Sequence, residues 1–127
     1  MNINKLSILP LVLLLSGVLT GCYYDAIPTP AAIDREVSFT GDIIPIFNKS
    51  CNSAGCHNAG GIKPDLSAAN ALAALSDDGY INIANPENSL LYETMTGAQT
   101  LMPPSGKLPE TDRNLVLAWI EQGALNN

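Results

Sequence analysis

The segment Cys51-Asn-Ser-Ala-Gly-Cys56-His57 combines two thiols with the only histidine of the chain. Two cysteines followed directly by a histidine are typical of covalent haem attachment, in which two thioethers hold the porphyrin edge and the histidine binds the iron. The usual signature places two residues between the cysteines, whereas this chain has four. A wider loop that contains Gly55 can still bring both sulfurs to the vinyl groups while His57 lies beneath the iron. The segment therefore predicts one covalently bound haem c.

Two other uses of these cysteines stay open. Cys51 and Cys56 could form a disulfide in an oxidising compartment, although so short a loop would gain little stability from chain entropy and would leave His57 unexplained. A zinc or iron–sulfur site needs four ligands, and only Cys51, Cys56 and His57 are left if Cys22 carries a lipid. Both alternatives explain fewer of these residues than haem attachment does.

A methionine further along the chain is expected to supply the second iron ligand. A low-spin electron-transfer haem needs such a ligand, and a thioether raises its reduction potential. Met95 falls in an expected helix, where methionine more often fills the core. Met102 precedes Pro103-Pro104 in a glycine-rich loop, and two prolines limit the conformations that the loop loses when it presents the sulfur. Met102 is therefore the predicted ligand, and Met95 is the alternative.

Short helices between glycine- and proline-rich loops are expected to position these residues. Their predicted ranges are 42–50, with Asp42 as the N-cap and Pro45 in the first turn; 67–75, capped by Asp65 or Ser67; 86–95, with Leu90 and Leu91 facing inward; and 109 or 111 to 122, followed by Gly123. In the last helix Leu115, Ala118 and Trp119 share one side, with Val116 and Ile120 beside them. Because no run of alternating β-branched residues occurs, the sequence predicts a small all-α domain of three to five short helices.

The first 21 residues have the pattern of an export signal. The segment Met1–Lys5 carries one positive charge, an apolar run too short to span a bilayer follows, and Leu19-Thr20-Gly21-Cys22 ends the run. These last four residues resemble the lipobox of bacterial lipoproteins, in which cleavage precedes the cysteine and the cysteine is acylated. We expect a signal peptide over 1–21, a lipid anchor on Cys22 and a flexible tether over 22–38. A plain signal peptide beside an unmodified Cys22 is the alternative.

Charge restricts the classes of partner. The chain has 12 acidic and 6 basic side chains, a formal charge of −6 at pH 7, which argues against nucleic-acid binding because phosphates need clustered Lys and Arg. Docking proteins are expected to present a basic surface. No second apolar stretch reaches the roughly 20 residues of a membrane span, so the lipid anchor is the expected membrane contact. Tyr23 rather than Asp follows Cys22, which favours the outer membrane over inner-membrane retention.

From Phe39 to Ala124 the chain resembles the small class I cytochrome c domains found in bacterial lipoproteins and cytochrome modules. The matching segments keep one order along the chain: Ile44-Pro-Ile-Phe47, Cys56-His57-Asn-Ala-Gly60, Leu66-Ser67, Pro86-Glu-Asn-Ser-Leu-Leu-Tyr92, Met102-Pro-Pro104 and Trp119-Ile-Glu-Gln-Gly-Ala124. The resemblance implies a cytochrome c domain over 39–127, with Cys51 and Cys56 as thioether positions, His57 as proximal ligand and Met102 as distal ligand. It also implies that the first and last helices cross, and we place Phe47 near Leu115 or Trp119 there. The four-residue spacer departs from the family pattern.

The second nitrogen of the histidine ring also needs a partner. We expect His57 to donate its other ring N–H to a backbone carbonyl, which would fix the plane of the ring. By position, the Ile62-Lys-Pro64 loop is the candidate acceptor.

These observations predict a membrane-anchored monohaem cytochrome c that carries single electrons between extracytoplasmic redox partners. No substrate bond is made or broken, so the protein is expected to be an electron carrier and not an enzyme. One alternative is a haem-based sensor or carrier of a small ligand, in which Met102 does not hold the iron. The other is a disulfide-containing structural lipoprotein without a cofactor.

Overall fold

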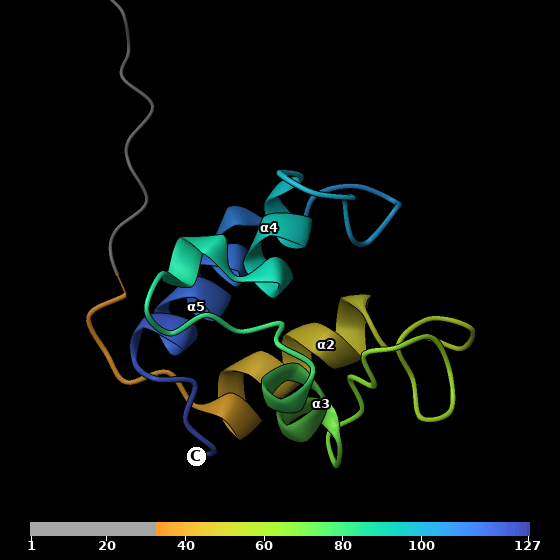
Figure 1. Ribbon diagram of the computed structural model, residues 1–127, viewed down its shortest axis with the longest axis horizontal. Helices are drawn as coiled ribbons and strands as arrows, with labels where there is room; N and C mark the ends of the chain where they lie inside the picture. The colour runs from red at the N-terminus through yellow and green to blue at the C-terminus, as the bar shows by residue number, and fades with distance from the viewer. Residues whose placement is uncertain (1–32) are drawn as a thin grey trace, which may run out of the picture.

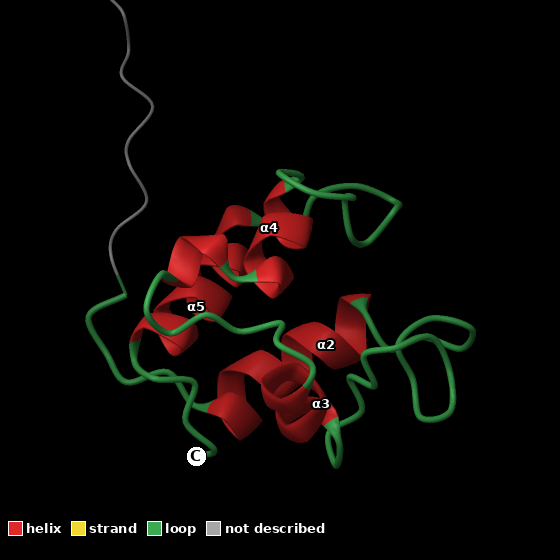
Figure 2. Ribbon diagram, viewed as in Figure 1, coloured by secondary structure: helices red, strands yellow, loops and turns green. Residues whose placement is uncertain are grey.

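The computed structural model describes residues 33–127, and this part of the chain contains helices and loops with no strand (Figure 2). The elements, in chain order, are η2 (Phe39–Ile43), α2 (Ile44–Ser50), α3 (Ala71–Asp77), η3 (Pro86–Asn88), α4 (Leu90–Thr96) and α5 (Glu110–Glu121). The predicted all-α class is confirmed. The predicted signal peptide, the acylated Cys22 and the tether up to residue 32 lie outside the described residues. Between residues 33 and 127, no helix is both long and apolar enough to cross a membrane.

The first helical unit begins earlier than predicted. Ser38 caps η2, because its Oγ accepts a hydrogen bond from the Gly41 N–H at 3.0 Å. The predicted cap, Asp42, instead accepts a hydrogen bond from the Ser38 N–H at 2.9 Å and pairs with Arg35 at 2.7 Å. Hydrogen bonding from the Arg35 guanidinium lowers the pKa of Asp42 below its usual value. η2 continues directly into α2, which has Pro45 in its first turn. The combined unit ends at Ser50, as predicted.

The core joins this first unit to the last helix. Phe39 of η2 stacks on Trp119 of α5, with ring centroids 5.1 Å apart and planes inclined by 27°. Trp119 is fully buried, and its Nε1–H donates to the Leu125 carbonyl at 3.0 Å. Phe47 is fully buried in the same core cluster as Trp119, against which Leu115 also packs, whereas the aromatic ring that stacks on Trp119 is that of Phe39.

Two of the remaining helices differ from their predicted ranges. The predicted helix over 67–75 is replaced by a turn over 67–70 that is followed by α3. Before this turn, Asp65 Oδ1 accepts a hydrogen bond from the Ser67 N–H at 2.9 Å. The predicted helix over 86–95 breaks at Ser89, whose backbone is extended and whose buried Oγ accepts from the Asn82 N–H at 2.9 Å. The break changes which face points inward: Leu91 is buried as predicted, but Leu90 is 40% exposed, contrary to the prediction. Helix α5 lies where it was predicted.

Residues 33–38 pack against the domain, beside the end of α5 (Figure 1). Val37 is only 1% exposed, and its N–H donates to Gln122 Oε1 at 2.8 Å. Gln122 Nε2 donates in turn to the Arg35 carbonyl at 3.0 Å. These residues are thus part of the domain, although the sequence placed them in the tether over 22–38.

Replacing Gln122 by Ala is expected to lower the free energy of unfolding by about 1–3 kcal/mol, because the part-buried Val37 N–H loses its acceptor. Urea unfolding followed by the fluorescence of Trp119 measures this loss. Glu121→Ala removes the exposed neighbouring side chain on the same helix and serves as the control. Equal losses in the two variants would show that Gln122 does not hold residues 33–38.

Candidate cofactor site

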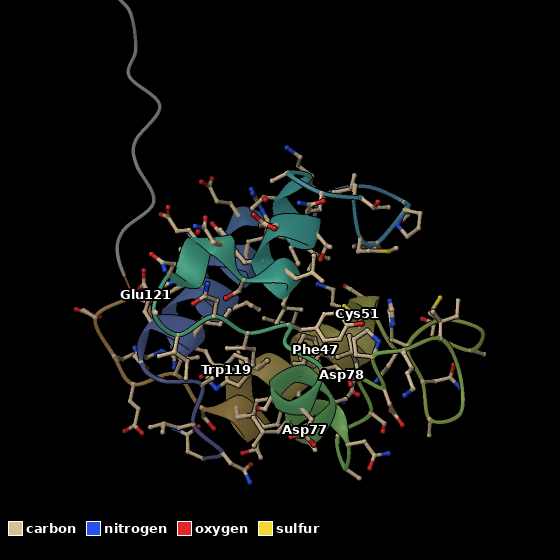
Figure 3. All side chains as sticks on the ribbon, viewed as in Figure 1. Phe47, Cys51, Asp77, Asp78, Trp119 and Glu121 are labelled. Carbon is tan, nitrogen blue, oxygen red and sulfur yellow. The ribbon has the colours of Figure 1, made fainter. Side chains whose placement is uncertain are left out.

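The loop after α2 carries Cys51, Cys56 and His57 in a closed turn. The Cys51 N–H donates to the Phe47 carbonyl at 2.8 Å and ends α2. Within the spacer the Cys56 N–H donates to the Ser53 carbonyl at 2.9 Å, and the His57 N–H donates to the Cys51 carbonyl at 3.1 Å. The four-residue spacer therefore closes on itself and places His57 beside the first cysteine of the pair, at the end of α2 where Cys51 is labelled in Figure 3.

The ring of His57 has a defined tautomer. Its Nδ1 lies 3.1 Å from the carbonyl oxygen of Ile62 and 3.1 Å from that of Pro64. A carbonyl oxygen only accepts hydrogen bonds, so Nδ1 carries a ring hydrogen, and in the neutral imidazole Nε2 then presents its lone pair. The predicted hydrogen bond to the 62–64 loop is confirmed. Histidines that bind metals commonly have this arrangement, because the second hydrogen bond fixes the ring and raises the basicity of the ligating nitrogen.

The loop that presents these carbonyls is anchored at Leu66. The Leu66 N–H donates to the His57 carbonyl at 2.7 Å, and the Leu66 side chain is buried in the core. Asn52 Nδ2 donates to the Leu66 carbonyl at 3.1 Å and to Asn48 Oδ1 at 2.7 Å, which ties the loop back to α2. The position of the His57 ring is therefore fixed by the core and by α2 together.

Gly61 is required by close packing inside this loop, a role that the sequence did not reveal. A Cβ atom at Gly61 would overlap the Cys56 carbonyl and Asn58 Oδ1. Gly61→Ala is therefore expected to displace the loop that holds His57 and to lower the free energy of unfolding by about 1–3 kcal/mol. Chemical denaturation measures the loss. Ala59→Ser, at an exposed position of the same loop, should leave stability unchanged, and a harmless Gly61→Ala would contradict the packing argument.

Both thiols of the segment are free. Cys56 is exposed and Cys51 is half-buried, and no disulfide joins them. Burial, with a smaller contribution from neighbouring Cys56, raises the pKa of the Cys51 thiol to about 11, so this thiol is protonated at neutral pH. Over residues 33–127 no three His, Cys, Asp or Glu side chains gather as a metal-ion ligand set. Cys51, Cys56 and His57 are therefore close in the chain without converging on one point.

The two methionines have different surroundings. Met95 lies in α4 and is 3% exposed, which confirms its predicted place in the core. Met102 is partly exposed on the loop between α4 and α5, where its N–H donates to the Thr94 carbonyl at 2.9 Å. The structure thus brings Cys51, Cys56 and His57 onto one loop and places Met102 on a second.

An open pocket of about 350 Å³ separates these two loops. Residues from the end of α2 and the cysteine loop line one side, and residues that follow Met102 line the other. The lining residues are Lys49, Ser50, Ser53, Pro103, Ser105, Gly106, Lys107, Leu108 and Pro109. No motif singles out the two lysines or the serines, because only the fold brings them together.

Comparison with protein-family models, with curated proteins and with solved structures found no match to this chain. Assignment of the site therefore depends on its own residues and their geometry.

Proposed function

We propose that this protein is a monohaem c-type cytochrome that carries single electrons. The observation that carries the proposal is the state of His57: its Nδ1–H is held by the Ile62 and Pro64 carbonyls, so Nε2 is free to bind a metal. This histidine directly follows one free thiol and lies on the same closed turn as a second. A zinc site and a structural disulfide each leave part of this combination without a role.

The residues present fit a covalently attached haem. Cys51 and Cys56 would form the thioethers, His57 Nε2 would bind the iron, and Met102 would be the second ligand. When bound, the haem supplies one-electron chemistry between ferric and ferrous iron. The chain itself orients the imidazole through the 62–64 carbonyls and supports the Met102 loop through the Thr94 carbonyl. Exposure of Cys56 and of the neighbouring spacer leaves this side of the domain accessible to a redox partner.

The proposal extends to the fold and the partners. A helical domain in which the first helical unit contacts the last helix is compatible with a class I cytochrome c fold. Its partners would be extracytoplasmic redox proteins, for which the net charge of −6 favours a basic docking surface.

The mass and the visible spectrum of the full chain, produced in cells with a haem c maturation system, test the function. We expect a mass increase of one haem that survives acid–acetone extraction, together with sharp bands in the reduced spectrum. A colourless protein with a mass lower by a pair of hydrogens would support the disulfide-containing lipoprotein instead. A shift of the ferrous spectrum by CO at neutral pH, without denaturant, would support the ligand sensor or carrier.

We also propose that Cys22 carries the lipid anchor on the extracytoplasmic side, with Tyr23 favouring the outer membrane. Cys22→Ser is expected to move the protein to the soluble fraction or to leave it unprocessed, because acyl chains supply the membrane affinity. Tyr24→Ser keeps the cysteine and should remain in the membrane fraction. Normal processing and membrane recovery of Cys22→Ser would contradict the anchor.

A further inference from the structure

The spacer between the two cysteines contains one residue whose side chain reaches beyond the loop. Asn52 follows the first cysteine, and its N–H donates to the Phe47 carbonyl at 3.0 Å, so its backbone continues the last turn of α2. The rest of the spacer turns back, because Gly55 adopts the left-handed conformation with φ of 80° and the Cys56 N–H donates to the Ser53 carbonyl. The wide spacer is thus made of one residue that extends α2 and a turn that returns the chain to the histidine.

The Asn52 side chain connects α2 to the loop that holds the imidazole. Its Nδ2 donates one hydrogen bond to Asn48 Oδ1, 2.7 Å away and about one helical turn earlier, and a second to the Leu66 carbonyl at 3.1 Å. The amide therefore uses both of its N–H donors in this bridge. Among the described residues, Asn52 and His57 are the only side chains found to hydrogen bond to the backbone of residues 62–66.

This bridge lies next to the acceptors of the His57 ring. Nδ1 lies 3.1 Å from both the Ile62 and the Pro64 carbonyl oxygens, and Pro64 is buried two residues before Leu66. The Leu66 N–H donates to the His57 carbonyl at 2.7 Å, so the backbone of Leu66 is held from two sides. If the Asn52 amide is removed, the part-buried Leu66 carbonyl loses this partner, and the loop is free to move away from Nδ1.

We propose that Asn52 is the positioning residue of His57 and holds the 62–66 loop so that both carbonyls stay in hydrogen-bond contact with Nδ1. The four-residue spacer then has a defined role, because it supplies the side chain that connects α2 to this loop. A fixed Nδ1–H bond raises the basicity of Nε2, and a more basic ligand favours the more positive, oxidised state of a bound iron. This consequence for the reduction potential rests on the proposed function, whereas the hydrogen bond at Nδ1 does not.

Solvent exchange of the His57 Nδ1–H, measured by nuclear magnetic resonance on the reduced full chain labelled with isotope-enriched histidine, tests the positioning. The chain has one histidine, so its signal is unambiguous. Asn52→Leu keeps the approximate shape of the side chain without its donors and is expected to speed the exchange about fivefold or more, the equivalent of one lost hydrogen bond. Asn70→Leu is the matched control, because it removes an exposed amide that donates to the Asp65 carboxylate at 2.8 Å, one residue before Leu66.

Unchanged exchange in Asn52→Leu, or an equal increase in Asn70→Leu, would overturn the proposal. Should Asn52→Leu fail to fold, Asn48→Ala decides the question, because Asn48 is exposed and its replacement removes only the α2 end of the bridge. Faster exchange in Asn48→Ala, by a smaller factor, supports the role of Asn52, and unchanged exchange overturns it.

The midpoint potential of the haem-loaded protein tests the consequence for the redox centre. It is expected to rise in Asn52→Leu and to stay unchanged in Asn70→Leu. Faster exchange without a change in potential would overturn the redox part of the inference. A chain that shows the expected exchange but never acquires haem would refute the proposed function and leave the role of Asn52 intact, whereas a haem protein with unchanged exchange would refute only the inference.

Discussion

Replacing Met102 by Leu is expected to remove the low-spin spectrum of the haem-loaded protein and to lower its reduction potential. Axial ligands shift haem potentials over a range of roughly 0.8 V, and loss of a thioether acts in the downward direction. The fold should tolerate the change, because Met102 is partly exposed and its one described hydrogen bond, to the Thr94 carbonyl, comes from the backbone. Visible spectroscopy and a redox titration measure both effects.

Met95→Leu is the matched control, because it makes the same substitution at a buried position. Met95 packs in the core from α4, so its replacement should lower the free energy of unfolding by up to about 1.5 kcal/mol and leave spectrum and potential unchanged. The reverse pattern would move the iron ligand to Met95. An unchanged spectrum in both variants would remove methionine ligation from the proposal.

The sequence predicted the helical class and the last helix well, because their signals are local. Trp119, Val116 and Ile120 recur at helical spacing, and Gly123 adopts the left-handed conformation, with φ of 98°, that suits the position after α5. The start of the first helix was misplaced for an equally local reason. Ser38 and Asp42 are both good N-caps four residues apart, and the pairing of Asp42 with Arg35 decides between them.

Other errors came from contacts that no local pattern contains. Residues 33–38 have few large apolar side chains, yet Val37 is buried in the core, and Gln122, 85 residues away, accepts its N–H. Ser89 breaks the predicted 86–95 helix by bonding to Asn82, and the break exposes Leu90. Such pairings exist only once the chain has folded, so spacing alone could not reveal them.

The residues of the candidate site that a cofactor requires could be predicted from the sequence. A metal-binding imidazole needs a partner for its second nitrogen, and the 62–64 loop, the candidate by its position in the chain, supplies that partner. The close approach at Gly61 and the pocket between two loops depend on how the segments meet. Motif chemistry therefore located the residues that would hold a cofactor, while their surroundings required the structure.

Replacing Trp119 by Ala is expected to have the largest effect on stability, about 3–5 kcal/mol of the free energy of unfolding. A small domain has only about 5–15 kcal/mol in total, so this variant should be close to unfolding. Trp119 is fully buried, stacks on Phe39 and bonds to the Leu125 carbonyl. Because it is the only tryptophan, urea unfolding of these variants has to be followed by far-ultraviolet circular dichroism.

A double-mutant cycle with Phe39→Ala separates the stack from simple burial. We expect the two rings to be coupled by about 0.5–1.5 kcal/mol, and Trp119→Phe, which keeps an aromatic ring but loses the Nε1–H, to cost much less than Trp119→Ala. The stack is also connected to the candidate site through the backbone. Phe39 lies in η2, η2 continues into α2, and the Cys51 N–H at the end of α2 donates to the Phe47 carbonyl. Loss of the stack in Phe39→Ala should therefore make the position of the cysteine loop less well defined. Lower haem incorporation in this variant would measure the effect. Additive losses with normal incorporation would show that the stack and the site are independent.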